Sequence, residues 1–300
     1  MTDLPVATTV PTSGAGRTHP PRTSQAGPVA LIVGGAFCTQ FGAAIAASLF
    51  PVVGVAGAVA LRLTFASVVL MAVCRPRLRG HRGTDWLVIL GFGVVLAGMN
   101  LLFYNAVARI PLGAAVTIEV LGPLTLSVIA SRRAASWLWA ALALGGVTLL
   151  GRDGFTGLTF AGVAFAAGAA SMWAAYILFS ERAGRRFTGL DGLALAMSAG
   201  TVLTLPLGFL SAGPVLVHPH SLALGFGVAM LSSLIPYSLE LISLRRIRAG
   251  TFGVLMSLAP AIAATAGFLV LGQPLTPIAV LAIALVIVAS IGAVRTKNPS

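Results

Sequence analysis

Long apolar runs alternate along the chain with short polar segments that hold most of its charges. A helix needs about 20 mainly apolar residues to cross a bilayer. The runs therefore predict an all-α integral membrane protein with about ten transmembrane helices. Between the first two helices only Pro51 and Gly54 indicate a turn. The predicted spans are 28–50, 52–74, 86–106, 111–130, 134–151, 159–180, 190–212, 222–244, 251–271 and 277–294.

The composition also indicates a membrane protein. Hydrophobic residues make up 57% of the chain and charged residues 9%, whereas a soluble domain carries about a quarter charged residues. Too few polar side chains remain to cover a water-facing surface, so lipid must solvate the helices. Cys38 and Cys74 lie in apolar runs and are interpreted as small hydrophobic residues. Segment 1–27 is rich in Pro, Ser, Thr and Gly, which predicts a disordered tail.

The arginines predict the orientation of the helices. If the N-terminus is cytoplasmic, the outside loops hold only Arg109 and Arg152, and the other loop arginines lie inside. The positive-inside rule produces this bias. We therefore expect a multi-pass protein of the cell (inner) membrane with both termini cytoplasmic, including the tail 295–300. The formal net charge of +12 then reflects topology, and its dispersal over short loops argues against a nucleic-acid partner.

Two segments of the chain resemble each other. "RIPLGAAVTIEVLGP" (109–123) and "RIRAGTFGVLMSLAP" (246–260) share Arg, Ile, Gly and Pro at the same offsets. They open the fourth and the ninth predicted spans and so enter the membrane from opposite sides. This predicts two inverted five-helix repeats, 28–151 and 157–294, an architecture of secondary transporters. The alternative is chance similarity between two apolar runs.

Arg62, Glu119 and Glu240 are ionisable residues inside the predicted spans. A charged side chain at the centre of a membrane helix costs roughly 2.5–3.5 kcal/mol on insertion scales, so such residues face the bundle interior or a water-filled cavity. Glu119 could instead pair with Arg62 and only join two helices. Glu240 lies near the end of its span and could extend toward Arg245 or water.

Further polar and aromatic residues share helix faces because they lie three or four positions apart. We expect these faces to line one cavity. The alternatives are plain packing for Trp173 and Tyr237, and interhelical hydrogen bonds worth roughly 0.6 kcal/mol for Gln40 and Asn100. The candidates are Gln40 in the first span, Asn100 and Tyr104 in the third, Trp173 and Tyr176 in the sixth, and Tyr237 with Glu240 in the eighth.

Prolines inside the spans predict helix breaks. A proline has no N–H to bond the carbonyl four residues earlier, so that oxygen can meet another donor. Pro123 acts in this way on Glu119, which places a free carbonyl beside the carboxylate. Breaks at membrane depth are tolerated where they line a cavity or are packed in protein. By the same rule Pro236 frees the carbonyl of Ser232, and Pro260 frees that of Met256.

Four stretches resemble the drug/metabolite transporter superfamily, in its EamA family and most closely its threonine/homoserine exporter branch. They are "QFGAAIAASLFPVVGVAGAVALRL" (40–63), "GMNLLFYNAVARIPLGAAVTIEVLGPL" (98–124), "SMWAAYILFSERAG" (171–184) and "IPYSLELISLRRIRAGTFGVLMSLAPA" (235–261). The resemblance implies ten helices, inverted repeats and export of small metabolites, chiefly amino acids. The lining positions that it implies are Gln40, Arg62, Asn100, Tyr104, Glu119, Trp173, Tyr176, Tyr237 and Glu240.

The chain departs from that family at two positions. Many relatives carry glutamates where this chain has Ala259, just before the ninth-span proline, and Gln273, at the end of that helix. If such a glutamate takes part in proton coupling, coupling here must rest on Glu119 and Glu240, or the substrate has changed.

The expected function is export of small amino acids such as threonine or homoserine by alternating access, with protons as the candidate coupling ion. Glu119 would meet the substrate ammonium, and Arg62 or helix N-terminal amides its carboxylate. The alternative is an exporter of cationic drugs or other small metabolites, since an acidic cavity with aromatic residues also suits cations. No enzyme motif, metal ligand set or cofactor motif is found in the spans. The expected partners are the small-molecule substrate and the lipid bilayer.

Overall fold

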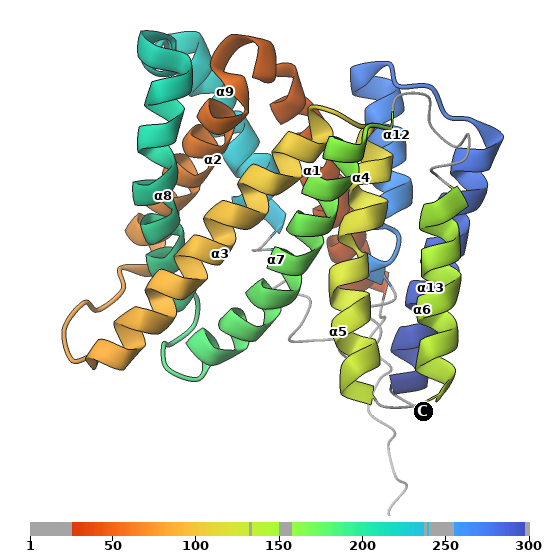
Figure 1. Cartoon of the computed structure of the whole chain (residues 1–300). Coiled ribbons are helices and arrows are strands. Elements are labelled where there is room, and N and C mark those ends of the chain that lie inside the picture. The colour runs from red at the N-terminus through yellow and green to blue at the C-terminus, as the bar shows by residue number, and fades with distance from the viewer. Residues whose placement is uncertain (1–25, 132–133, 150–157, 237–238, 240–254, 298–300) are drawn as a thin grey trace, which may run out of the picture.

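The computed structural model describes residues 26–131, 134–149, 158–236, 239 and 255–297, and the described chain is helical throughout apart from short connections (Figure 1). Its first part contains α1 (Ala26–Ser48), α2 (Phe50–Cys74), α3 (Gly83–Val107), α4 (Leu112–Glu119), α5 (Leu121–Ser131) and α6 (Ala134–Leu149). The second part contains α7 (Phe160–Gly184), α8 (Asp191–Ala212), η2 (Gly213–Val217), α9 (Pro219–Ala229), η3 (Met230–Leu234), α12 (Ala259–Leu271) and α13 (Pro277–Lys297).

Five of these helices are long and apolar enough to cross a membrane. They are Val29–Ser48, Phe50–Cys74, Gly83–Val107, Phe160–Gly184 and Asp191–Val217. Shorter apolar helices lie at 112–126, 137–149, 219–234, 259–271 and 277–292. Large apolar side chains also point outward, for example Val202 and Leu210 of α8, which are 72% and 85% exposed. These helices fall at the predicted places, and the count of ten spans stays a prediction.

The boundary between the first two helices lies earlier than predicted. The turn is at Leu49, and Phe50 belongs to α2 rather than to the first helix. Pro51 sits in the first turn of α2, where a helix does not need the missing N–H. Gly54 has φ of 69° and makes a kink inside α2 instead of a turn between helices. The prediction that Pro51 and Gly54 separate the helices was therefore wrong by a few residues.

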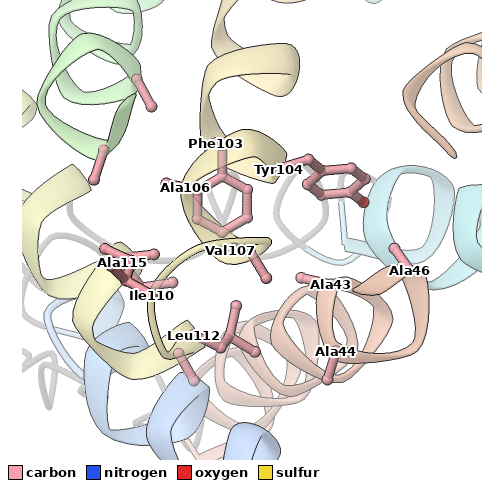
Figure 2. Close-up of a cluster of buried hydrophobic side chains, with 14 of the residues drawn as sticks. Ala43, Ala44, Ala46, Phe103, Tyr104, Ala106, Val107, Ile110, Leu112 and Ala115 are labelled. Atoms are coloured by element: carbon pink, nitrogen blue, oxygen red, sulfur yellow. The ribbon is translucent and has the colours of Figure 1, made fainter. Parts of the chain in front are cut away.

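Small residues let the helices pack closely. Helix α2 packs along α8, α3 along α7, and α6 along α13. In the main core, alanines of α1 face Phe103 and Tyr104 of α3 and Leu112 of α4 (Figure 2). Gly122 in α5 approaches the backbone carbonyl of Ala170 in α7 so closely that a Cβ would collide with it. This contact fixes α5 against α7 just beyond Glu119.

Two of the predicted spans are interrupted by turns. The fourth is divided at Val120, between α4 and α5. Before α12 the chain makes a turn at Ser257 and Leu258, followed by Pro260 in the first turn of the helix. Both interruptions lie two or three residues before a proline, as expected for a residue that cannot continue the hydrogen-bond ladder from within a helix.

Candidate functional site

Arg62 of α2 is held by the hydrogen bonds that it donates to two other helices. Its Nη1 donates to the Tyr104 hydroxyl at 3.1 Å, and its Nη2 donates to the Ser232 carbonyl at 3.0 Å. A longer contact of 3.4 Å joins Nε to the Ser233 hydroxyl. Because the three bonds use different nitrogens, they fix the plane of the guanidinium as well as its position. The charge is thus anchored inside the bundle rather than left to extend along its own helix.

The Ser232 carbonyl is open to Arg62 because of the local backbone. Pro236 lies four residues after Ser232 and cannot donate an N–H to it. The preceding residues form the π-helical turn η3, in which the N–H of Ile235 bonds to the carbonyl of Met230. Such turns inside helices are frequent at functional sites. The proline and the π turn together present a buried carbonyl to a charged donor.

Tyr104 is the partner of Arg62 on α3. Its side chain is fully buried, and its ring centroid lies 5.4 Å from that of Phe50. The Arg62 Cζ lies 5.6 Å from the centroid of the Tyr104 ring. Asn100, one turn earlier, is also buried, but its amide donates at 2.9 Å to the Leu96 carbonyl of its own helix. Of Asn100 and Tyr104, it is therefore Tyr104 that contacts the Arg62 guanidinium.

Glu119 is the last residue of α4, at the helix interruption. Residues 112–118 of α4 are all buried, whereas Glu119 keeps partial exposure. The Arg62 guanidinium acts on this carboxylate electrostatically. Among the described residues, ion pairs join Arg185 to Glu181 and Arg186 to Asp85. A structural ion pair between Arg62 and Glu119, considered from the sequence, stays an alternative.

The other predicted residues lie in different surroundings. Gln40 is buried in α1. Trp173 packs against the main core cluster. The Tyr176 ring lies 5.4 Å from the Phe92 ring, in a second cluster. Tyr237 and Glu240 fall outside the described residues, so their predicted place in the cavity stays a prediction.

Three polar residues contribute contacts that sequence reasoning did not assign. Ser232 and Ser233 bind Arg62, and Pro236 was the signal that pointed to the Ser232 carbonyl. Gln273, noted only as a departure from the family, accepts a hydrogen bond from the Leu112 N–H at 3.0 Å. It thereby caps the first turn of α4, which ends at Glu119. No local pattern could indicate this bond, because its partners lie 161 residues apart.

Comparison with known proteins assigns the chain to a family. The threonine/homoserine exporter RhtA of Escherichia coli strain K12 is 41% identical over 90% of this chain and 92% of its own length. The chain belongs to the EamA-like transporter family. The RhtA protein of Salmonella typhimurium strain SL1344 is 42% identical over 86% of this chain and 88% of its own. The EamA-like family itself matches residues 160–295. Both relatives are named as exporters.

A solved structure supports the fold. One crystal structure aligns with a TM-score of 0.61 and 22% identity, covering 88% of this chain and 96% of its own. Together with the apolar helices, the EamA relatives indicate a multi-pass inner-membrane protein.

Proposed function

We propose that this EamA transporter exports threonine, homoserine and similar small amino acids from the cytoplasm by alternating access. The observation that carries the proposal is a guanidinium fixed by hydrogen bonds inside an apolar bundle, with a carboxylate in electrostatic reach. An amino-acid zwitterion has the complementary pair of charges. The relatives at 41% and 42% identity, named threonine/homoserine exporters, support the same substrate class.

In the proposed complex, the substrate carboxylate meets Arg62 and the substrate ammonium meets Glu119. Arginine suits this role because its planar fork binds a carboxylate through two nitrogens. The Tyr104 hydroxyl and the Ser232 carbonyl hold the guanidinium ready, which reduces the ordering cost of binding. Charges interact more strongly inside the bundle than in water, because the effective dielectric constant is lower.

The proposed architecture has ten spans in two inverted five-helix repeats, with both termini cytoplasmic. In the ungapped match of 109–123 with 246–260, Val120 corresponds to Ser257, and both positions lie at helix interruptions. The EamA-like family matches 160–295, close to the second expected repeat at 157–294. A substrate site between such repeats lies near the middle of the membrane. An arginine and a glutamate inside the spans would be useful at this depth.

Protons are the proposed coupling ion, exchanged at Glu119. A carboxyl group at a helix interruption can reach water from either side as the transporter alternates. Gln273 occupies one of the positions where relatives carry a glutamate, and here it is used as a helix cap. This leaves Glu119 as the acidic group of the described site.

Export of radiolabelled threonine from preloaded cells tests the proposal. Glu119→Gln removes the charge with almost no change in shape, so export is expected to fall at least about tenfold if the carboxylate binds the ammonium or carries the proton. Glu181→Gln is the matched control, because Glu181 is exposed and its partner in the described chain is Arg185. Export by Glu119→Gln at the wild-type rate, at matched protein levels, would remove Glu119 from the mechanism.

A further inference from the structure

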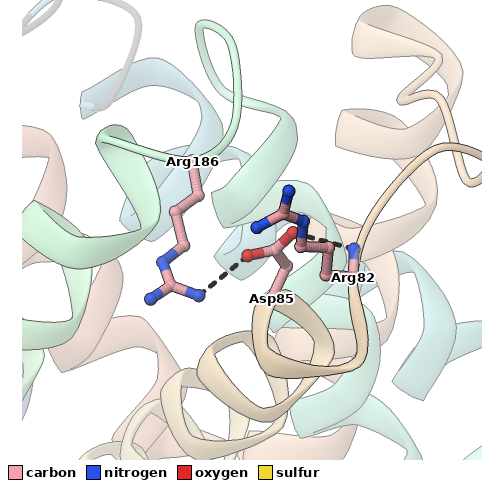
Figure 3. A network of polar contacts seen from close by, with 3 residues as sticks. All are labelled: Arg82, Asp85 and Arg186. Atoms are coloured by element: carbon pink, nitrogen blue, oxygen red, sulfur yellow. Dashed lines mark hydrogen bonds and ion pairs between the residues drawn. The ribbon is translucent and has the colours of Figure 1, made fainter.

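At one end of the bundle, side chains tie the α2–α3 connection and the first turn of α3 to the α7–α8 connection (Figure 3). Asp85 Oδ1 accepts a hydrogen bond from Arg186 Nη1 at 2.8 Å, and Asp85 Oδ2 accepts one from the Arg82 backbone N–H at 2.9 Å. Beside them, the His81 ring lies 4.5 Å from the Phe187 ring. Residues 101 positions apart in sequence therefore form a single surface.

This surface, called the arginine platform below, has far more positive than negative charge. Two of its three carboxylates already bind its own arginines: Asp85 binds Arg186, and Glu181 binds Arg185 at 2.6 Å. The third, Asp191, accepts a hydrogen bond from Thr188. The remaining arginines make no ion pair within the described chain. The platform arginines, all exposed, are Arg75, Arg77, Arg79, Arg82, Arg182, Arg185 and Arg186.

Exposed apolar side chains adjoin the arginines. Val73 and Leu87 are 74% and 68% exposed, and they lie at the ends of two helices that are long enough to cross a membrane. Arg75 follows directly after the last residue of α2, and Arg182 lies in the last turn of α7. The positive charges therefore sit where the apolar surface ends, which is the level of lipid headgroups.

The backbone of Arg75 adds an independent observation. Arg75 has φ of 46° and ψ of 56°, the left-handed conformation at the end of α2. Among the described residues it is the only non-glycine residue with positive φ. Glycine is the usual residue at such a helix end because it has no Cβ to strain. Here the chain keeps a charged side chain in spite of the strain, and such outliers often mark functional positions.

We propose that the arginine platform binds the phosphate groups of anionic phospholipids. The guanidinium fork matches phosphate oxygens geometrically, and clusters of basic residues at the membrane surface attract anionic lipid. The bound lipid would bridge the two connections that Asp85 and Arg186 already join. This inference concerns lipid binding and does not depend on which substrate the transporter carries.

Native mass spectrometry of the purified full-length chain tests the inference. The protein in neutral detergent is titrated with phosphatidylglycerol or with phosphatidylcholine, and bound lipids are counted. Phosphatidylglycerol is expected to bind more tightly, and the combined variant Arg75→Gly, Arg77→Gln, Arg79→Gln to lose roughly fivefold in affinity for each arginine removed. Equal binding of the two lipids by the wild type, or an unchanged affinity in the variant, would overturn the proposal.

The controls separate lipid binding from folding. Arg75→Gly should not weaken the helix end, because glycine relieves the positive φ. Arg75→Lys keeps the charge and should keep most of the affinity. Arg109→Gln, at the other end of α3, should bind phosphatidylglycerol like the wild type. If the combined variant does not fold, Arg182→Gln alone is expected to lose roughly fivefold, and no loss there refutes the inference.

Competition with inorganic phosphate shows whether the arginine platform binds a lipid headgroup or the free phosphate anion. Millimolar phosphate should not displace phosphatidylglycerol, because the acyl chains beside Val73 and Leu87 contribute to binding. If inorganic phosphate displaced phosphatidylglycerol when both are at the same concentration, the platform would be a site for the free anion, and the assignment to lipid would be overturned.

Discussion

Loss of the Tyr104 hydroxyl tests how Arg62 is positioned. Tyr104→Phe removes one oxygen from a fully buried side chain and leaves the Arg62 Nη1 without the acceptor that now lies 3.1 Å away. Leaving a buried donor without its partner costs about 1–3 kcal/mol, and the part-buried Arg62 should fall in the lower part of this range. The ring and its packing against Phe50 remain, so the loss is confined to the hydrogen bond.

Part of that cost should be seen in threonine binding. In Tyr104→Phe the bonds to Ser232 and Ser233 keep Arg62 in the site, but the plane of its guanidinium is no longer fixed. A loss of about 1.4 kcal/mol in substrate binding corresponds to a tenfold rise in KM. We therefore expect the KM for threonine, measured by transport into proteoliposomes, to rise about tenfold, with a smaller change in the maximal rate.

Thr117→Val is the matched control for the loss of a buried hydroxyl. Thr117 is fully buried in α4, and its hydroxyl donates only to the Gly113 carbonyl of the same helix. The control should therefore change the KM for threonine little. If Tyr104→Phe keeps the wild-type KM while its helical content is unchanged, the Tyr104 hydroxyl does not position Arg62 for the substrate.

Three further substitutions test the supports of the site. Gln273→Ala removes the acceptor from the first amide of α4 and should lower the unfolding free energy by about 0.5–2 kcal/mol, seen as a lower midpoint in a thermal melt. Gly122→Ala places a Cβ against the Ala170 carbonyl and should destabilise α5 against α7 by about 1–3 kcal/mol in the same melt. Pro236→Ala supplies an N–H that can compete with Arg62 for the Ser232 carbonyl, so the transport KM for threonine should rise while the melt stays close to wild type.

Each of these has a contrasting outcome. Gly145→Ala is the control for Gly122→Ala, because a Cβ at Gly145 meets no atom within 4 Å. Equal melting midpoints for the two variants would show that the approach of Gly122 to Ala170 does not stabilise the fold. An unchanged melt for Gln273→Ala would mean that water caps α4 equally well. A wild-type KM for Pro236→Ala would show that the Ser232 carbonyl does not hold Arg62 in place.

Local rules anticipated the backbone of the site better than its side-chain contacts. The helix interruption before Pro123 and the open Ser232 carbonyl follow from the chemistry of proline, so both could be inferred without coordinates. The helix boundary near Pro51 was misplaced, since a proline is as well suited to the first turn of a helix as to the turn before it.

The contacts of Arg62 could not be inferred in the same way. Its bond to Ser232 joins residues 170 apart, and the bond of Gln273 to Leu112 spans 161. Such pairs depend on how whole helices pack. For Asn100 an interhelical hydrogen bond was the alternative to lining the cavity, but its amide donates to a carbonyl of its own helix.

The most direct measurement compares threonine with threoninamide, which keeps the ammonium but lacks the carboxylate, as competitors of labelled threonine transport in proteoliposomes. If Arg62 binds the carboxylate, wild-type protein should discriminate against threoninamide by about tenfold or more, and Arg62→Gln should lose that discrimination along with its affinity for threonine. Discrimination that survives in Arg62→Gln would contradict the claim that this guanidinium recognises the substrate.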